Sequence, residues 1–305
     1  MRIVVALGGN ALLQKGEPLD AVTLRRNVAT ACTAIARLAE GNELIIVHGN
    51  GPQVGLLALQ NAAYTATEAY PLDVLDAESE GMIGYLIESE LSSRLPAERA
   101  VATLLTRVEV AADDPAFAAP SKPIGPYYSE AESQTLAAQR GWQFVRNGDS
   151  FRRVVPSPLP QRLVDARPVQ WLLQQHAVVI CAGGGGIPVL ADGATRRGVE
   201  AVIDKDRCAA LLANTLHADL LLIVTGVTGV YRHFNEPQAE LLPRLQPGML
   251  DAGQLPAGSM GPKLSAAIDF VRQGGQRAAI GSLDQVLALA DGRGGSQLWR
   301  EDWRD

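Results

Sequence analysis

Residues 44–55 read LIIVHGNGPQVG, an apolar run that stops at His48 and is followed at once by two glycines, an asparagine and a proline. Residues 3–10, IVVALGGN, and residues 177–186, AVVICAGGGG, end in the same way. One such ending predicts a tight turn. Three in one chain predict that several buried strands deliver glycine backbone to a common place, and that a ligand is held there.

Strand and helix patterns alternate on both sides of these glycines. The first half alternates RIVVAL, a helix over 20–40, ELIIVH and a helix beginning in GPQVG. After Pro168 the alternation resumes with HAVVICA, a hairpin over 187–203, a helix from 204, DLLLIVT and a helix over 262–273. Near-continuous apolar strands between amphipathic helices predict a mostly parallel sheet covered on both faces. Ligands of such sheets bind beyond the carboxyl ends of the strands, where the glycines lie.

Residues 113–168 interrupt this alternation. One short helix is expected near 129–140, and Trp142, Phe144 and the stretch FRRVVPSP have strand character with apolar surface to pack. These features favour a protrusion or lid inserted in the main domain over a loose surface insertion. Prolines punctuate the segment at positions 115, 120, 123, 126, 156, 158, 160 and 168.

Composition narrows the class of protein. A chain of 305 residues can form one large α/β domain or two smaller ones. Its formal charge of −6 argues against a nucleic-acid partner. It has no signal-peptide pattern and no apolar run of the roughly 18 residues that a membrane helix needs, so we expect a cytoplasmic protein with no membrane partner. Three cysteines far apart, Cys32, Cys181 and Cys208, indicate neither a disulfide framework nor a zinc site.

Lysine is unusually rare in this chain. It accounts for four of the 27 basic residues, Lys15, Lys122, Lys205 and Lys263, and the rest are arginine. Three of the four stand in the contexts SKPIGP, VIDKD and GSMGPK. Either compositional drift spared these positions, or the compact and flexible ammonium group is specifically required there.

The ligand that suits glycine backbone at strand ends is an anion, above all phosphate. A P-loop is excluded because no lysine follows a glycine, and neither ALGGNALL nor HGNGPQVG has the spacing of a dinucleotide fingerprint. Transfer of a γ-phosphoryl group needs positioning and charge stabilisation, which glycine amides and mobile ammonium groups provide. Lys205 and Lys263 each stand near a predicted helix start, where the alternative is an ordinary solvated lysine.

Eight motifs together resemble those of the carbamate kinases in the amino acid kinase superfamily. In chain order from Val4 to Lys263 they are VVALGGNALL, HGNGPQVG, GMIGY, SKPIGP, RRVVPSP, GGGGIPV, VEAVIDKD and GSMGPK. The match covers nearly the whole chain, and HGNGPQVG and VEAVIDKD are its most specific parts. Three positions, Glu80, Arg107 and Thr228, depart from the glutamine, glutamine and acid that are common in that family.

The resemblance implies a fold, a reaction and partners. The fold is a three-layer αβα sandwich with a mostly parallel central sheet, one domain over 1–305 with a lid subdomain over 113–168, usually as a homodimer. The reaction is phosphoryl transfer between ATP and carbamate, giving carbamoyl phosphate and ADP, with Mg²⁺ accompanying the nucleotide. The usual direction is ATP synthesis, in arginine or ureide catabolism.

The resemblance also implies site residues. It implies Gly8, Gly9 and Asn10 at the transferring phosphoryl group, and Gly49, Asn50, Gly51 and Lys122 at the carbamate end. It implies Lys205, Lys263, Asp206 and Lys122 as catalytic residues, with Asp206 orienting the lysines, and no protein metal ligands. It implies a nucleotide site of Gly183, Gly184, Lys205, Thr225, Gly226, Val227, Tyr231, Met260 and Lys263.

The residues that are missing agree with this chemistry. Carbamate is already an anion, so its oxygen needs no general base, and His48, His176, His217 and His233 form no obvious catalytic pair. We expect His48, at a strand end, to be packed and hydrogen-bonded. Two alternatives stay open: an acylglutamate-type kinase, disfavoured by SKPIGP and VVPSP, and a carbamoyl phosphate- or nucleotide-binding protein with weak catalysis, disfavoured by the retained lysines.

Overall fold

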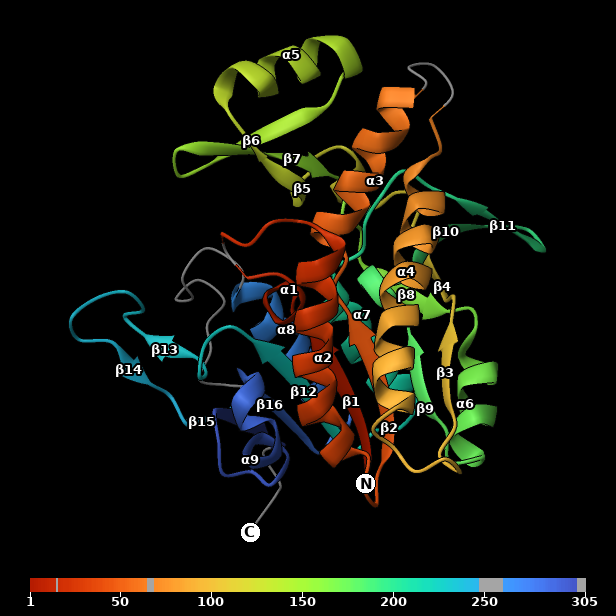
Figure 1. Ribbon diagram of the computed structural model, residues 1–305, viewed down its shortest axis with the longest axis vertical. Helices are drawn as coiled ribbons and strands as arrows, with labels where there is room; N and C mark the ends of the chain where they lie inside the picture. Colours follow the sequence, from red (N-terminus) through yellow and green to blue (C-terminus); the bar gives the residue numbers. More distant parts are fainter. Residues whose placement is uncertain (15, 65–68, 247–259, 301–305) are drawn as a thin grey trace.

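The computed structural model describes residues 1–14, 16–64, 69–246 and 260–300. Its centre is an eight-stranded sheet in the order β15-β17-β16-β12-β1-β2-β9-β3 (Figure 1). Every neighbouring pair in this sheet is parallel except β16 with β17, which confirms the mostly parallel sheet. The strands are β1 (Arg2–Leu7), β2 (Glu43–His48), β3 (Val101–Leu104), β9 (Val178–Cys181), β12 (Leu220–Thr225), β15 (Arg244–Leu245), β16 (Arg277–Ser282) and β17 (Ser296–Trp299).

Register brings the carboxyl ends of the central strands to one edge. Leu7 at the end of β1 pairs with His48 at the end of β2 on one side and with Val224 near the end of β12 on the other. Ile46 of β2 pairs with Ile180 of β9. The glycines that follow β1, β2 and β9 therefore lie along the same edge of the sheet, as the sequence predicts.

Helices cover both faces of the sheet, which completes the three layers (Figure 1). Alternate residues of β1 and β2 point to opposite faces, so Ile3 and Val5 pack with one set of helices and Val4 and Ala6 with the other. The first set is α2 (Ala21–Leu38), α4 (Leu72–Ser92) and α9 (Val286–Ala290). The second set is α6 (Ala166–Gln174), α7 (Lys205–Thr215) and α8 (Met260–Arg272).

Helix α2 shows how closely the local sequence sets these elements. Asp20 caps its start, accepting a hydrogen bond from the backbone N–H of Thr23 at 2.8 Å. The predicted apolar stripe is buried, and the chain turns away through Gly41 at a φ of 70°. The stripe residues are Val28, Ala31, Cys32 and Ile35.

Two smaller sheets flank the main one. The predicted hairpin forms β10 (Ile187–Asp192) and β11 (Thr195–Gly198), and it joins β4 (Arg107–Val110) and β8 (Pro160–Leu163) in a four-stranded sheet. The other small sheet contains β5 (Lys122–Tyr128), β7 (Ser150–Val155) and β6 (Gln143–Asn147), and with α5 (Glu130–Arg140) it protrudes from the body (Figure 1). This protruding sheet lies within the range 113–168 proposed as a lid, whereas β8 from the same range pairs with β4 of the body.

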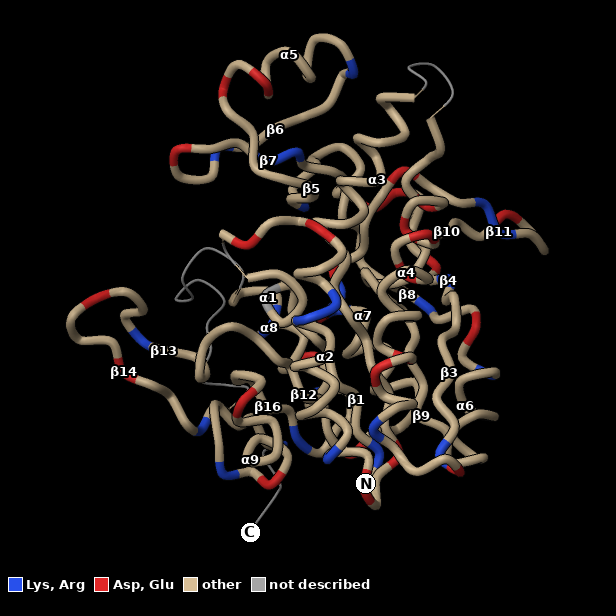
Figure 2. The backbone as a smooth tube through the Cα atoms, viewed as in Figure 1, with Lys and Arg blue, Asp and Glu red and all other residues tan. Residues whose placement is uncertain are grey.

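A small hairpin, the distribution of charge and the length of the helices remain to be described. A small hairpin of β13 (Tyr231–Arg232) and β14 (Glu240–Leu241) extends from the side of the main sheet (Figure 1). Figure 2 shows acidic and basic positions interspersed along the chain. In the described ranges, no helix is both long enough and apolar enough to cross a membrane.

Candidate active site

The first glycine turn joins β1 to the short helix α1 (Gly9–Leu12). The N–H of Gly8 donates to the carbonyl of Val224 at 2.9 Å, so it is occupied within the protein and does not serve as the donor to phosphate that the resemblance implies. A Cβ on Gly8 would lie 2.6 Å from that carbonyl oxygen, so only glycine fits. Gly9 and Asn10 begin the helix, where N–H groups have no intrahelical acceptor, and a Cβ on Gly9 would meet nothing within 4 Å. Gly9 thus faces open space with backbone donors beside it.

The second turn, Gly49–Gly51, lies against the first. A Cβ on Gly49 would be 3.3 Å from the nitrogen of Gly9 and 3.6 Å from Cδ of Lys205. Residues from three elements that the sequence predicts as site residues are therefore neighbours. Gly51 begins α3 (Gly51–Tyr64), whose first N–H groups add positive potential to this loop.

The side chain of Asn50 is committed to the protein interior. It is 2% exposed, and its Nδ2 donates to Asp76 Oδ1 and to Ser79 Oγ, both at 2.9 Å. The N–H of Gly49 donates to the carbonyl of Leu7 at 3.1 Å, so what the Gly49–Gly51 loop offers to a ligand is the backbone of Asn50 and Gly51.

A lysine–aspartate–lysine cluster lies beside these turns. Lys205 Nζ donates to Asp206 Oδ1, and Lys263 Nζ donates to Asp206 Oδ2 at 3.0 Å. All three residues are at most 9% exposed. Burial alone would raise the pKa of Asp206, but the charges of Lys205 and Lys263 hold it below its ordinary value. One ionised carboxylate therefore holds two ammonium groups together at the carboxyl edge of the sheet.

Lys122 comes to the same place from the protruding sheet. Its Nζ lies 2.5 Å from Asp204 Oδ2, and Asp204 caps α7 by accepting the N–H groups of Asp206 and Arg207. Burial alone would raise the pKa of Asp204, but the charge and hydrogen bond of Lys122 hold it well below its ordinary range. The ion pair therefore joins the protrusion to the residue that precedes Lys205.

Glycines allow the protruding sheet to rest directly on α3. A Cβ on Gly55 of α3 would lie 2.1 Å from Cα of Gly125 in β5, and Gly125 has a φ of 71°. Neither position accepts a side chain, because one contact is backbone against backbone and the other residue is left-handed. This contact fixes the height of β5, and with it Lys122, above the Gly49–Gly51 loop.

The third turn follows β9. Gly184, Gly185 and Gly186 all have positive φ, and a Cβ on Gly184 would lie 2.1 Å from Asn50 Nδ2. A Cβ on Gly183 would lie 2.3 Å from the ring of His48. The structure thus places Gly183 and Gly184 against the loop proposed for carbamate, and their role in nucleotide binding stays a prediction.

His48 is packed as the sequence predicts. It is fully buried, with Nδ1 3.2 Å from the carbonyl oxygen of Gly49. Burial lowers the pKa of His48 to about 4, so the ring is neutral at neutral pH. A neutral, enclosed imidazole is suited to packing the strand end.

The stretch proposed for the nucleotide follows β12. Thr225 ends that strand, and its Cα would be 3.6 Å from a Cβ on Gly8, so it adjoins the first turn. Tyr231 lies in β13 with its ring centroid 5.8 Å from that of Phe234. Met260 begins α8, which also carries Lys263. Gly226 and Val227 lie in the connection from Thr225 to this hairpin, and their place in a nucleotide pocket stays a prediction.

Sequence reasoning missed two acids that hold the site together, Asp204 and Asp76, and it noticed a third, Glu80, only as a departure from the family. Asp204 stands two residues before Asp206, where a helix-capping signal was readable but its partner Lys122 was not. Asp76 and Glu80 lie on one face of α4 and are 1% exposed, although a glutamate or aspartate in a helix ordinarily signals solvent. Of the three departures from the family, Arg107 forms a two-bond ion pair with Asp165, and Glu80 is buried.

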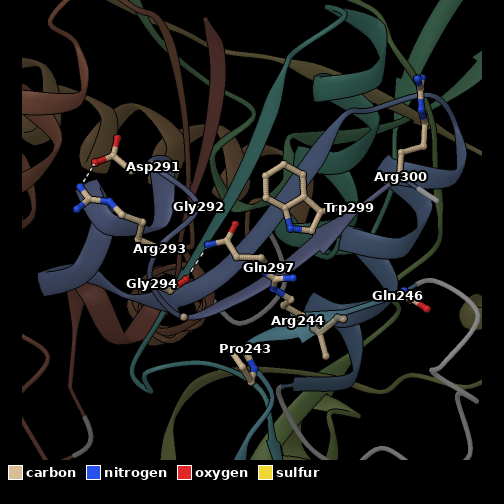
Figure 3. Close-up of a pocket in the computed structure, with 12 residues that line it drawn as sticks. Pro243, Arg244, Gln246, Asp291, Gly292, Arg293, Gly294, Gln297, Trp299 and Arg300 are labelled. Atoms are coloured by element: carbon tan, nitrogen blue, oxygen red, sulfur yellow. Dashed lines mark hydrogen bonds and ion pairs between the residues drawn. The ribbon is translucent and has the colours of Figure 1, made fainter. Parts of the chain in front are cut away.

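A separate hollow lies away from these residues. It has a volume of about 540 Å³, and Figure 3 shows Arg244, Arg293, Gln297 and Trp299 around it, with Arg293 paired to Asp291. Trp299 pairs in register with Arg277 at the start of β16, hence at the opposite edge of the sheet from the glycine turns. The size of this hollow therefore does not make it part of the site.

Glycine backbone at the carboxyl edge of an αβα sandwich, with buried lysines beside it, is an arrangement for phosphoryl groups. The model of the amino acid kinase family matches residues 1–282, and the chain belongs to that family. Within the family it groups with the carbamate kinases. It is 51% identical to the carbamate kinase of Haemophilus influenzae over 302 residues, covering 99% of this chain and 97% of that protein. It is 50% identical to that of Escherichia coli K12 over 294 residues, covering 96% and 98%.

Solved structures agree. Carbamate kinase from Giardia lamblia bound to citric acid superposes with a TM-score of 0.91 at 36% identity, covering 98% of each chain. The same enzyme bound to AMP-PNP gives 0.87 at 36% identity, again covering 98% of each chain. An N-acetylglutamate synthase from Neisseria gonorrhoeae gives 0.59 at 17% identity, covering 98% of this chain and 61% of that one, and shares the fold alone.

Proposed function

We propose that this chain catalyses reversible phosphoryl transfer between ATP and carbamate, giving ADP and carbamoyl phosphate. The observation that carries the proposal is the buried Lys205–Asp206–Lys263 cluster beside the Gly9 and Gly49 turns. The similarity to carbamate kinases over nearly the full chain supports the choice of acceptor.

The transferring phosphoryl group is bound by backbone and lysine together. The N–H groups of Gly9 and Asn10 donate to its oxygens, and Gly8 supplies the close turn rather than a donor. Lys205 and Lys263 compensate the charge that spreads over those oxygens in the transition state. Asp206 keeps the two ammonium groups fixed, so little reorganisation is needed during transfer.

Carbamate binds at the other end of the in-line path. The N–H groups of Asn50 and Gly51 face it from the body of the protein, and Lys122 faces it from the lid. Gly49, whose N–H donates to Leu7, supplies the turn that packs against Gly9. Lys122 and Asp204 are 24% and 15% exposed as side chains, so their ion pair is accessible enough to exchange for a substrate anion. Closing the lid over an anion then replaces one charge partner by another.

The acceptor requires no proton removal. Carbamate carries its own negative charge, and the nearest imidazole, His48, is buried and neutral. The lysines and amides therefore perform the catalysis by charge compensation and alignment.

The nucleotide extends from the phosphoryl group along the edge of β12. Thr225, Gly226, Val227, Tyr231 and Met260 line its pocket. Gly183 and Gly184, which the resemblance also gives to the nucleotide, pack on His48 and Asn50, and we assign them to the carbamate end instead. Mg²⁺, when bound with the nucleotide, would neutralise part of the phosphate charge. The carboxylates nearest the phosphates, Asp204 and Asp206, are both paired with lysine, which fits a metal ion held mainly by phosphate oxygens and water.

The proposal has a wider frame. It includes the single domain over 1–305 with residues 113–168 as the lid, a homodimer, a cytoplasmic location, and service in arginine or ureide breakdown with ATP as the product. Support comes from the direct contact of β5 with α3 and from the absence of long apolar helices in the described ranges.

A coupled assay tests the activity. Purified protein with ADP, Mg²⁺ and carbamoyl phosphate should form ATP, measured with hexokinase and glucose 6-phosphate dehydrogenase. ATP with N-acetylglutamate serves as the contrasting substrate pair. Turnover of the acylated amino acid without ATP formation from carbamoyl phosphate would overturn the proposal, and binding of both ligands without turnover would leave a binding protein.

A further inference from the structure

Glu80 is a buried carboxyl that the proposed chemistry does not use. It lies on α4, is 1% exposed, and has no lysine or arginine among its hydrogen-bond partners. Burial raises the pKa of Glu80 to about 8, opposed by its two backbone hydrogen bonds. A carboxyl group is costly to keep in such a place unless its hydrogen bonds are needed.

The two hydrogen bonds of Glu80 join two loops of the site. Oε1 accepts the N–H of Gly183 at 2.8 Å, and Oε2 accepts the N–H of Thr106 at 3.1 Å. Thr106 also accepts the N–H of Ala182 on its Oγ1 at 3.0 Å and the N–H of Ile187 on its carbonyl at 2.8 Å. The chain after β3 and the glycine turn after β9 are thus bound to one carboxyl and to each other.

The glycine turn needs such support because its backbone is strained. Ala182 has a φ of 51° although it has a Cβ, and Gly184 to Gly186 are also left-handed. Gly185 and Gly186 have no room for a side chain, since a Cβ would lie 2.5 Å from the carbonyl of Ile203 and 2.4 Å from Val108. A turn held in this shape can act as a fixed surface for its neighbour.

That neighbour is Asn50. Cα of Gly184 packs on the Asn50 amide, whose Nδ2 is held by Asp76 and Ser79. Asp76, Ser79 and Glu80 are spaced i, i+3 and i+4, so they share one face of α4. We call these three residues the α4 brace. The brace holds Asn50 from one side directly and from the other through the glycine turn.

We infer that the α4 brace fixes the Gly49–Gly51 loop, and that Glu80 is a positioning residue for the carbamate end of the site. The inference rests on the proposed function, because it assigns that end to carbamate. Glu80 touches no substrate and acts through Gly183. Loosening it should misplace the loop amides and weaken binding at the carbamate end, while the ADP contacts from Lys263 and Thr225 stay in place.

Glu80→Gln tests the inference with little change of shape. Glutamine is common at this position in the family, so the variant measures what the second acceptor of Glu80 adds in this chain. The glutamine oxygen can accept one of the two N–H groups, but the NH₂ group cannot accept the other, so one amide loses its partner. We expect the KM for carbamoyl phosphate to rise about tenfold, which is typical when a residue that holds a ligand-binding group in place is changed. The KM for ADP should stay unchanged. Hydrogen exchange of the amides in 104–107 and 180–187 should also quicken. Glu78→Gln, an exposed change on the same helix, is the control and should alter neither.

Two outcomes would overturn the inference: unchanged exchange together with an unchanged KM for carbamoyl phosphate, or an equal rise in both KM values. If Glu80→Gln does not fold, Ser79→Ala decides. It removes one of two acceptors from Asn50 and should raise the same KM several-fold, and no change would refute the brace. Failure of the proposed function looks different, because wild-type protein would then form no ATP while the exchange experiment still reports on Glu80.

Discussion

Replacing Gly55 by alanine tests whether the contact of the protruding sheet with α3 sets the position of Lys122. The new Cβ would lie 2.1 Å from Cα and 2.2 Å from the nitrogen of Gly125. Both neighbours are backbone atoms of a strand, so no side chain can rotate away. Restoring an ordinary carbon–carbon separation of about 3.5 Å requires β5 to move away from α3 by about 1.4 Å.

That movement should appear in kinetics more than in stability. Lys122 is three residues from Gly125 on β5, and its Nζ–Asp204 distance is 2.5 Å. A shift of about 1 Å in a positioned group can cost on the order of 10²-fold, whereas overpacking of this kind costs about 1–3 kcal/mol of stability. We therefore expect the KM for carbamoyl phosphate to rise by about tenfold to a hundredfold, with the KM for ADP near that of the wild type.

The assay measures initial rates of ATP formation with each substrate varied in turn, on protein shown to be folded by circular dichroism. Gly81→Ala is the matched control, since it adds a methyl to a helical glycine that has nothing within 4 Å of its Cβ. A folded Gly55→Ala protein with an unchanged KM for carbamoyl phosphate would refute the reasoning, because Lys122 would then act independently of the seating of the strand.

Three further results are expected. Lys205→Ala and Lys263→Ala should each lower kcat by about 10² or more in the same assay, because each removes a charge from the transition state, and near-normal turnover would remove that lysine from the mechanism. Lys122→Ala should weaken the binding of carbamoyl phosphate rather than that of ADP. A raised KM for ADP with an unchanged KM for carbamoyl phosphate would contradict the proposed contact of Lys122 with the carbamate end. Glu80 should make stability fall as pH rises. Burial raises its folded pKa from 4.5 to about 8, so the unfolded chain binds fewer protons across that range. The free energy of unfolding should fall by about 5 kcal/mol at most between pH 4.5 and pH 8 and stay constant above pH 8, and Glu80→Gln should lack this fall. Urea unfolding at several pH values measures it, and the same pH dependence in both proteins would refute the prediction.

The parts of the fold that follow from sequence are those with a repeated local signal. The apolar runs of β1, β2, β9 and β12 are buried along their length, and a glycine-containing turn follows each of them. Strands β4 and β8, RVEV and PQRL, are short and charged. Strand β4 forms because β10 of the hairpin pairs with it, and β8 forms because it pairs with β4. The pairing of strands that are far apart in sequence depends on the tertiary structure, so the sequence of either strand alone does not predict it.

The same division separates the site residues. The lysines could be found because they are rare, whereas Asp206 came only from the resemblance to the carbamate kinases. The hydrogen bond of Gly8 could not be predicted, because its N–H reaches the carbonyl of Val224 only when β1 and β12 are neighbours in the sheet. Glu80 was noticed as a departure from the family, yet its two backbone partners come from loops 26 and 103 positions away in sequence.

The two lysine groups of the site differ in how tightly the protein holds them, and this difference follows the reaction. Lys205 and Asp206 side chains are 8% and 3% exposed, so their charges are fixed and dry, as transition-state stabilisation requires. The side chains of Lys122 and Asp204 are 24% and 15% exposed. Lys122 lies on the protruding sheet and Asp204 on the body of the protein, so solvent can replace either partner. A fixed pair beside the Gly9 turn and a more exposed pair under the protruding sheet fit the roles proposed for them, because an entering anion would replace Asp204 on Lys122 without leaving a bare ammonium group in the interior.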